Sequence, residues 1–186
     1  MPVTLRDLAT NAEIRDRIFL ICDIDAAPDE PAPNWITIDG STDFSVIARD
    51  GTGGLFLVMP GSPRIVYASS EGQAGVIAAG LEELMTLIVT CPYYESLLQY
   101  SGNGNVDEMR RAAPFSEESW MGDEDEFAAA CAYLKELGIA EPKDVIGALH
   151  RAVSTPIDVR FHDQPAMPLF GRFVIEDNPF YRMQKG

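Results

Sequence analysis

The residues in this chain whose types and spacing could support catalysis are mainly carboxylates. Asp23-Ile24-Asp25 follows the apolar run Ile18–Cys22, so two acids could stand at the end of a buried strand. A second acidic group, Gly122-Asp123-Glu124-Asp125, lies much later in the chain. Carboxylate oxygens are preferred ligands of Mg²⁺, so the two groups would suit Mg²⁺-dependent phosphoryl transfer.

A structural explanation of the same residues competes with this chemistry. The pair Asp23 and Asp25 is similar to a strand end in haloacid-dehalogenase-type phosphotransferases, but Ala26 stands where Thr or Val is usual. The apolar run before it fits a helix better than a strand, and strands and helices do not alternate convincingly. We therefore expect a helix over residues 4–22 that leads into a solvated acidic loop over 23–33. The Mg²⁺-dependent phosphatase that uses Asp23 and Asp25 is kept as an alternative.

Other residue types give no catalytic arrangement. His150 and His162 have no His, Cys or Glu partner at metal-ligand spacing. Ser69 and Ser70 lack a nucleophile-elbow sequence and a paired histidine. The cysteines are far apart and indicate free thiols in a reducing compartment; they are Cys22, Cys91 and Cys131. The sequence therefore predicts no enzyme activity, no cofactor and no metal site.

The charge balance restricts the class of partner. The 186 residues include 14 Lys and Arg against 29 Asp and Glu, which gives a formal net charge of −15 at pH 7. Binding to nucleic-acid phosphates or to an anionic membrane depends on Lys and Arg, so neither is expected. The N-terminus shows no signal pattern, and no apolar stretch reaches membrane-spanning length. Together with the free thiols, these features predict a cytoplasmic protein.

The acids gather in two stretches with few compensating cations. Residues 23–50 contain Arg49 as their one Lys or Arg, and residues 116–127 contain none. Solvated loops and a helix N-terminus that favours negative charge would explain both stretches. An electrostatic docking surface for a basic protein is the functional alternative. Its candidate residues are Asp23, Asp25, Asp29, Glu30, Asp39, Asp43, Glu117, Glu118, Asp123, Glu124, Asp125 and Glu126.

Between these stretches the chain has the pattern of strands. Four short apolar runs are closed by turn residues, at 35–38, 44–49, 55–59 and 64–68. The Gly-rich turn Asp50–Gly54 leads into a strand, so it predicts a hairpin rather than a phosphate-binding loop. Pro60–Pro63 predicts a second hairpin. Together these runs indicate a small antiparallel meander.

The strongest helical periodicity predicts one long helix from Gln73 to Cys91. Its apolar residues recur at intervals of three and four, at Ile77, Leu81, Leu84, Ile88 and Cys91. Ser70 and Gln73 fit a capping box at the start, and the charge of Glu71 argues against an anion there. Pro92 should kink or end this helix. Further helices are expected over 93–100, 106–113 and 127–137 and from 142, and strands over 157–161 and 169–175.

This order of elements predicts an α+β fold with a central antiparallel sheet and flanking helices. The length suits a single domain over residues 1–186. Its core would span about residues 1–100, followed by a helical and strand extension over about 105–186. The C-terminal strands could extend the sheet or pack separately.

The central block resembles the SMI1/KNR4-like (SUKH) superfamily over residues 47–85. The turn Asp50-Gly51-Thr52-Gly53-Gly54 is similar to a Gly-rich turn of its members. The strand end Val66-Tyr67, followed by Ser69-Ser70-Glu71-Gly72, is similar to a second motif. The later Glu82-Glu83-Leu84 resembles a third motif.

The resemblance implies an antiparallel α+β fold without a catalytic site. Many bacterial members look like immunity proteins, which neutralise a cognate toxin domain, often a nuclease, by binding it. Others look like regulatory or scaffold proteins, and this is the alternative. The resemblance also implies that motif residues maintain the fold: Asp50, Gly51, Gly53, Gly54, Tyr67, Ser69, Ser70, Glu71 and Gly72. Combined with the acidic stretches, it predicts a basic protein partner.

Overall fold

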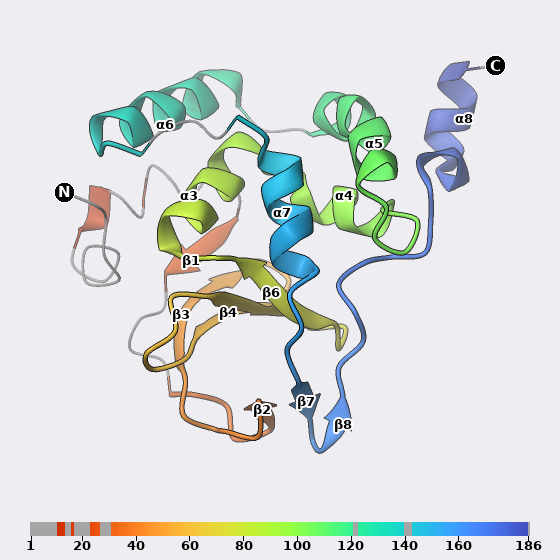
Figure 1. Ribbon diagram of the computed structural model, residues 1–186. Coiled ribbons are helices and arrows are strands. Elements are labelled where there is room, and N and C mark those ends of the chain that lie inside the picture. The colour runs from red at the N-terminus through yellow and green to blue at the C-terminus, as the bar shows by residue number, and fades with distance from the viewer. Residues whose placement is uncertain are drawn as a thin grey trace.

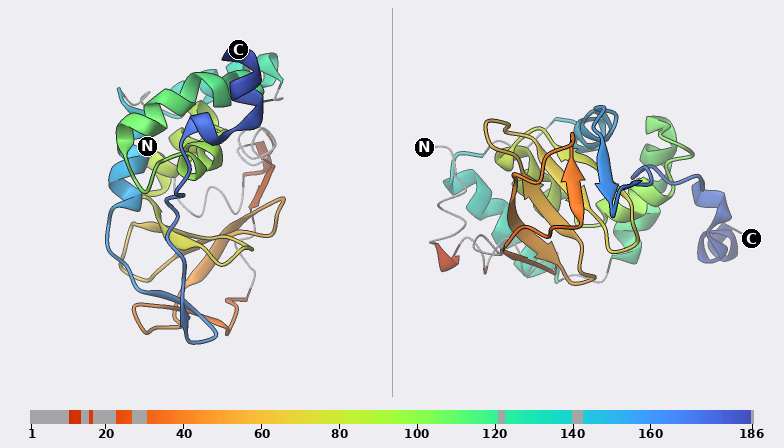
Figure 2. Two further views of the ribbon diagram at one scale, coloured as in Figure 1. Left: turned by 90° about the vertical axis from the view of Figure 1, so that its right-hand side faces the viewer. Right: turned by 90° about the horizontal axis from the view of Figure 1, so that it is seen from below.

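The chain is arranged in three layers (Figure 1). The computed structural model describes residues 11–13, 16, 23–26, 31–120, 123–139 and 143–185. Helices form one outer layer, a five-stranded sheet the middle layer, and a three-stranded sheet the other outer layer. Figure 2 shows the small sheet on the face of the large sheet away from the helices.

The five-stranded sheet is antiparallel throughout and has the order β1-β3-β4-β5-β6. These strands are β1 (Ile24–Ala26), β3 (Ser45–Asp50), β4 (Leu55–Val58), β5 (Ile65–Ala68) and β6 (Ala74–Ala78). Strands β3 to β6 form a meander, so the predicted α+β class and central antiparallel sheet are confirmed. The predicted hairpins after Asp50 and Pro60 are also confirmed.

Both faces of this sheet are buried, and successive side chains along a strand point into opposite cores. On the helix side, Phe56 packs with Ile88 and with other apolar residues of the helices. Leu55 and Leu57 pack on the other side with Ile36 of the small sheet. Because side chains alternate along a strand, a strand covered on both faces reads as a continuous apolar run. This explains the unbroken Leu55–Met59 pattern.

The small sheet joins residues that are far apart in the sequence. It contains β2 (Ile36–Ile38), β7 (Val159–Phe161) and β8 (Gln164–Pro165), with β7 in the middle. Ile36 pairs with Phe161 and Ile38 with Val159. Figure 2 shows β2 and β7 side by side beneath the large sheet. The C-terminal strands thus form a second sheet and do not extend the first.

The helical layer covers the opposite face. It comprises α3 (Leu81–Thr90), α4 (Tyr94–Gln99), α5 (Val106–Ser119), α6 (Glu124–Glu136), α7 (Val145–Val153) and α8 (Pro179–Lys185), with a 3-10 turn at Ile175–Asp177. Helices α3 and α7 pack against β6. As expected, α3 ends before Pro92 and α4 begins after it. No helix of the described residues is both long and apolar enough to cross a membrane.

The predicted helix from Gln73 to Cys91 is wrong over its first eight residues. Residues Ala74–Ala78 form strand β6, and the helix begins only at Leu81. Hydrogen bonds to β5 decide the outcome, and Ile77 reaches the helix-side core from a strand as well as it would from a helix. The predicted capping box is therefore absent. The Gln73 amide instead donates to Ser69 Oγ (3.1 Å) and closes the β5–β6 turn.

Three further expectations are corrected. The acidic loop over 23–33 contains strand β1, because buried Ile24 pairs with Asp50 at the sheet edge. Helix α5 runs past 113 and through Pro114 to Ser119, since Phe115 buries its second half against Tyr181. Residues 169–175 are not a strand. Most of the expected helix over 4–22 lies outside the described residues.

The segment 166–173, here named the crossing segment, runs from the small sheet to the helical layer (Figure 1). The Met167 amide donates to the Gly72 carbonyl, and the Ala74 amide donates to the Met167 carbonyl, both at 2.9 Å. The Gly171 amide then donates to the Leu98 carbonyl of α4 (2.8 Å). The backbone of the crossing segment therefore forms hydrogen bonds first with the β5–β6 turn and then with α4. Because it pairs with no single element along its length, it is not a regular strand.

Gly171 is required by the close approach of this segment to α4. A Cβ at this position would collide with the backbone carbonyl of Gln99, which cannot rotate away. We expect Gly171→Ala to lower the free energy of unfolding by about 1–3 kcal/mol, measured by urea denaturation. Gly80→Ala is the control, because its Cβ would find the Pro63 carbonyl at an ordinary 3.8 Å. It should cost less than Gly171→Ala, although Gly80 is the N-cap of α3, where Ala is less favourable than Gly. Equal losses for the two variants would contradict this packing.

Candidate functional site

The second acidic stretch forms an exposed surface where α5 ends and α6 begins. Glu117 and Glu118 are exposed in the last turn of α5. Asp123 caps α6, and its Oδ1 accepts from the amides of Asp125 (2.9 Å) and Glu126 (3.1 Å). We name this the α5–α6 acidic surface, defined by Glu117, Glu118, Asp123, Glu124, Asp125 and Glu126, all of them exposed.

Two aromatic side chains lie within this surface. Trp120, the C-cap of α5, and Phe127, in the second turn of α6, contact each other edge to face with ring centroids 5.6 Å apart. Both are half-buried, so each still offers apolar area to a partner. Trp is the residue type most enriched among interface hot spots, and an apolar centre with a polar rim is the usual anatomy of a docking surface.

The charge of the α5–α6 acidic surface is not neutralised within the described part of the chain. None of its six carboxylates forms an ion pair with a described residue. Elsewhere acids do find cations: Arg110 bridges Asp107 and Asp144, and Arg111 pairs with Glu108 and Glu176. Because no described cation neutralises these six carboxylates, their negative charge can attract a basic partner.

The other candidate acids do not join this surface. Asp39 and Asp43 flank the turn between β2 and β3, at the end of the molecule opposite α6 (Figure 1). Asp39 has a structural role, since its Oδ1 accepts from the Asp158 amide (3.0 Å). Asp23 and Asp25 are exposed at edge strand β1. Asp29 and Glu30 lie outside the described residues.

The two turn motifs of the sequence meet at Asp50 and Tyr67. Asp50 Oδ1 accepts from the amides of Thr52 (2.9 Å) and Gly54 (2.8 Å) and from the Thr52 hydroxyl (2.7 Å). Its Oδ2 accepts from the Tyr67 hydroxyl at 2.5 Å. Gly54 is required here, because a Cβ would meet the Tyr67 hydroxyl oxygen at 2.5 Å. One carboxylate thus fixes the β3–β4 turn against the end of β5.

These contacts set the pKa values of the pair. Burial alone would raise the pKa of Asp50, but the hydrogen bonds from Tyr67, Thr52 and Gly54 outweigh it and lower the pKa below 3.8. Burial and the bond to Asp50 raise the pKa of Tyr67 well above its usual 10.0. The phenol therefore keeps its proton and donates it to the carboxylate.

The remaining motif residues form the β5–β6 turn. Ser69, Ser70, Glu71 and Gly72 follow Ala68, and the Ser69 hydroxyl donates to Gln73 Oε1 (3.2 Å). Glu71 is exposed and precedes a strand, so the helix start considered there does not exist. Gly53 lies beside this turn, since its Cβ would stand 3.9 Å from that of Ser70.

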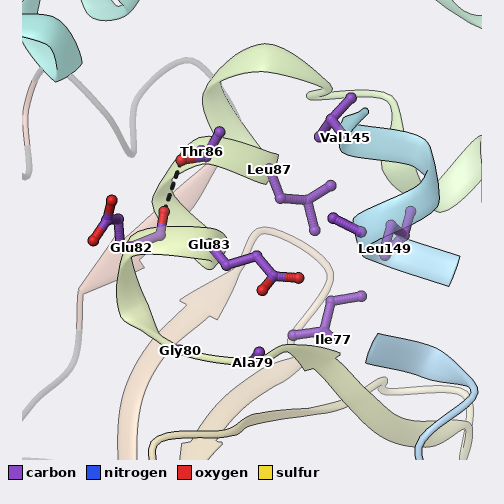
Figure 3. Close-up of a pocket in the computed structure, with 10 residues that line it drawn as sticks. Ile77, Ala79, Gly80, Glu82, Glu83, Thr86, Leu87, Val145 and Leu149 are labelled. Carbon is purple, nitrogen blue, oxygen red and sulfur yellow. Dashed lines mark hydrogen bonds between the residues drawn. The ribbon is translucent and has the colours of Figure 1, made fainter. Parts of the chain in front are cut away.

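A groove of about 430 Å³ lies between α3, α7 and β6 (Figure 3). Its walls are mainly apolar, with Ile77, Leu87 and Leu149 facing the space, and the Glu83 carboxylate points into it. Glu82 points away, and its carbonyl accepts from the Thr86 hydroxyl (2.8 Å). This groove is separate from the α5–α6 acidic surface, and nothing in the described residues indicates an occupant.

The residues considered for metal or covalent chemistry have packing roles. His150 Nε2 lies 2.8 Å from the Gly104 carbonyl, and His162 stacks on Trp35. Burial raises the pKa of the Cys91 thiol to about 12, which makes it unreactive. In the described residues, no group of three or more His, Cys, Asp or Glu could hold a metal ion.

Sequence reasoning missed Glu95, Trp120 and the crossing segment. Trp120 could have been noticed, because it lies in a stretch without Lys or Arg. Glu95 carries no sequence signal, since its neighbours Tyr67 and Asp50 are far away in the chain.

Comparison with protein-family models, curated proteins and solved structures finds no match to this chain. The SUKH resemblance therefore stays a prediction.

Removing the Tyr67 hydroxyl should destabilise the fold in a pH-dependent way. Asp50 has a lowered pKa in the folded state, so its stabilisation is present above pH 3.8 and is lost as the pH falls through the folded value. We expect Tyr67→Phe to cost about 1–3 kcal/mol at pH 7 and less at pH 2, measured by urea denaturation. Thr52→Val, which removes a more exposed donor, should cost less. A Tyr67→Phe protein as stable as the parent at pH 7 would contradict the role of this bond.

Proposed function

We propose that this protein is a non-catalytic binding module of the bacterial immunity type, which neutralises a basic toxin domain by covering it. The observation that carries the proposal is the α5–α6 acidic surface: six exposed acids without a described cationic partner, surrounding Trp120 and Phe127. In this proposal the protein acts in the cytoplasm and binds no nucleic acid itself.

In this proposal the acidic charge affects the association rate, and the apolar area affects the dissociation rate. A nuclease must bind phosphates, so its active face is basic, and an acidic surface attracts that face from a distance. Charge complementarity mainly raises the association rate and fixes orientation. The aromatic pair would supply the short-range contact that slows dissociation, as interface hot spots do.

The proposed SUKH relationship agrees with this arrangement. Asp50 and Tyr67, on which the resemblance rests, bind each other and tie two turns together. They are therefore occupied in holding the sheet and leave recognition to other surfaces. In the regulatory or scaffold alternative the same surface would meet a host protein; an adjacent gene for a large secreted toxin favours immunity instead.

The test is binding of the full chain to the toxin domain encoded beside it, measured by surface plasmon resonance. Because attraction by unpaired acids is screened by salt, we expect association to slow markedly between 50 and 300 mM NaCl, roughly the range over which the Debye length falls below 10 Å. Glu117→Gln/Glu118→Gln should slow association several-fold. Trp120→Ala should raise Kd by about 30-fold or more through faster dissociation.

The matched control is Asp43→Asn/Asp163→Asn, which removes the same charge from exposed positions at the small-sheet end of the molecule. It should leave both rate constants nearly unchanged. No binding at micromolar concentrations would refute the proposed function. Equal effects of the two double variants would show that net charge, and not this surface, directs association.

A further inference from the structure

A second hollow, larger than the α3–α7 groove, lies beside the Asp50–Tyr67 pair. Its volume is about 720 Å³. The β5–β6 turn with Glu71, Tyr67 and Glu95 of α4 line one part of it. The crossing segment, which is hydrogen-bonded beside that turn, forms a further wall with Met167 and Phe173. We name it the Glu95 cavity. Its walls thus combine carboxylates with a long apolar surface.

Glu95 is exposed, and the described side chains offer it only weak donors. Its Oε1 lies 3.4 Å from the hydroxyls of both Tyr67 and Tyr94, at the long limit for such a bond. A phenol has one proton to donate, and Tyr67 donates its proton to Asp50 at 2.5 Å. Desolvation and the nearby charges of Asp50 and Glu71 raise the pKa of Glu95. A cation beside Glu95 would offset the repulsion from Asp50 and Glu71 and would give the carboxylate a strong donor.

No described cation is paired with the two glutamates of this cavity. Neither Glu71 nor Glu95 forms an ion pair with a described residue. Arg172 also lines the cavity, but its guanidinium lies over the Phe173 ring, 5.0 Å from the centroid, and forms no ion pair with a described residue. A metal ion is not indicated, since no described group of acids could hold one.

The wall formed by the crossing segment offers apolar surface. Met167 is 53% exposed and Phe173 is 40% exposed, so two large apolar side chains of this wall stand in water. Both belong to a segment held in place by backbone hydrogen bonds to the β5–β6 turn and to α4. A ligand with an apolar stem and a cationic end would satisfy both walls.

We propose that the Glu95 cavity receives an arginine side chain of the protein partner, an inference that rests on the proposed binding to a basic protein. The methylene stem lies against Met167 and Phe173, and the guanidinium bridges Glu95 and Glu71. Arginine suits this site better than lysine, because its planar group offers five donors to two carboxylates and stacks on aromatic rings. The cavity would then recognise one residue, while the α5–α6 acidic surface attracts the partner as a whole.

The test uses the full chain and a small probe, N-acetyl-arginine methylamide, titrated in ¹H–¹⁵N NMR spectra at pH 7. We expect saturable shifts at the amides of residues 69–73 and 170–173. The corresponding lysine derivative should bind more weakly. N-acetyl-citrulline methylamide, in which a neutral urea group replaces the guanidinium, should cause no saturable shift. Glu95→Gln should weaken arginine binding about tenfold, since it removes one charge-assisted contact. Glu71→Gln, at an exposed turn, should weaken binding in the same direction and guards against a folding defect in the first variant.

Glu83→Gln is the matched control, because Glu83 points into the other groove and should leave the titration unchanged. Equal shifts with citrulline, or binding that Glu95→Gln and Glu71→Gln leave intact, would overturn the proposal. The probe requires no toxin, so its failure leaves the proposed function standing. Conversely, arginine binding without any toxin binding would retain the cavity as a site and reject the immunity role.

Discussion

The rest of the structure depends on the need to cover both faces of the five-stranded sheet. Strands β4 and β5 carry apolar side chains on each face, so neither face can be left in water. Helices α3 and α7 cover one face. The other is covered by β2 and β7, which meet across more than a hundred residues of sequence. The C-terminal part of the chain is thereby built into both cores.

This constraint also creates the Glu95 cavity. After β8 the chain must return from the small sheet to the helical layer, and the crossing segment does so along the β5–β6 turn and α4. Its backbone is hydrogen-bonded to both, so Met167 and Phe173 line the same cavity as Glu71 and Glu95. The Asp50–Tyr67 bond fixes the position of Tyr67 in this cavity and takes the Tyr67 proton, which Glu95 could otherwise have accepted. The binding site we propose is thus a consequence of how the layers are connected.

Sequence patterns predicted the parts of the fold that local chemistry determines. The alternating strands, the two hairpin turns and the helix break at Pro92 follow from side-chain spacing and backbone restriction, and all are confirmed. The pattern failed at Ile77, because an apolar residue at that position satisfies a strand and a helix equally and pairing with β5 decides between them. It failed again at Leu169, whose segment takes its hydrogen bonds from two distant elements. The exposure of the six acids of the α5–α6 acidic surface follows from residue type, whereas Glu95 gains its surroundings from residues that only the fold brings together.

The central claim is that a basic toxin domain docks on the α5–α6 acidic surface and places an arginine in the Glu95 cavity. Hydrogen–deuterium exchange of the full chain, with and without that domain, tests it most directly. The account predicts slower exchange at residues 115–130 and 167–173 in the complex. Protection confined to β2, β7 and β8, with none at residues 115–130, would contradict it.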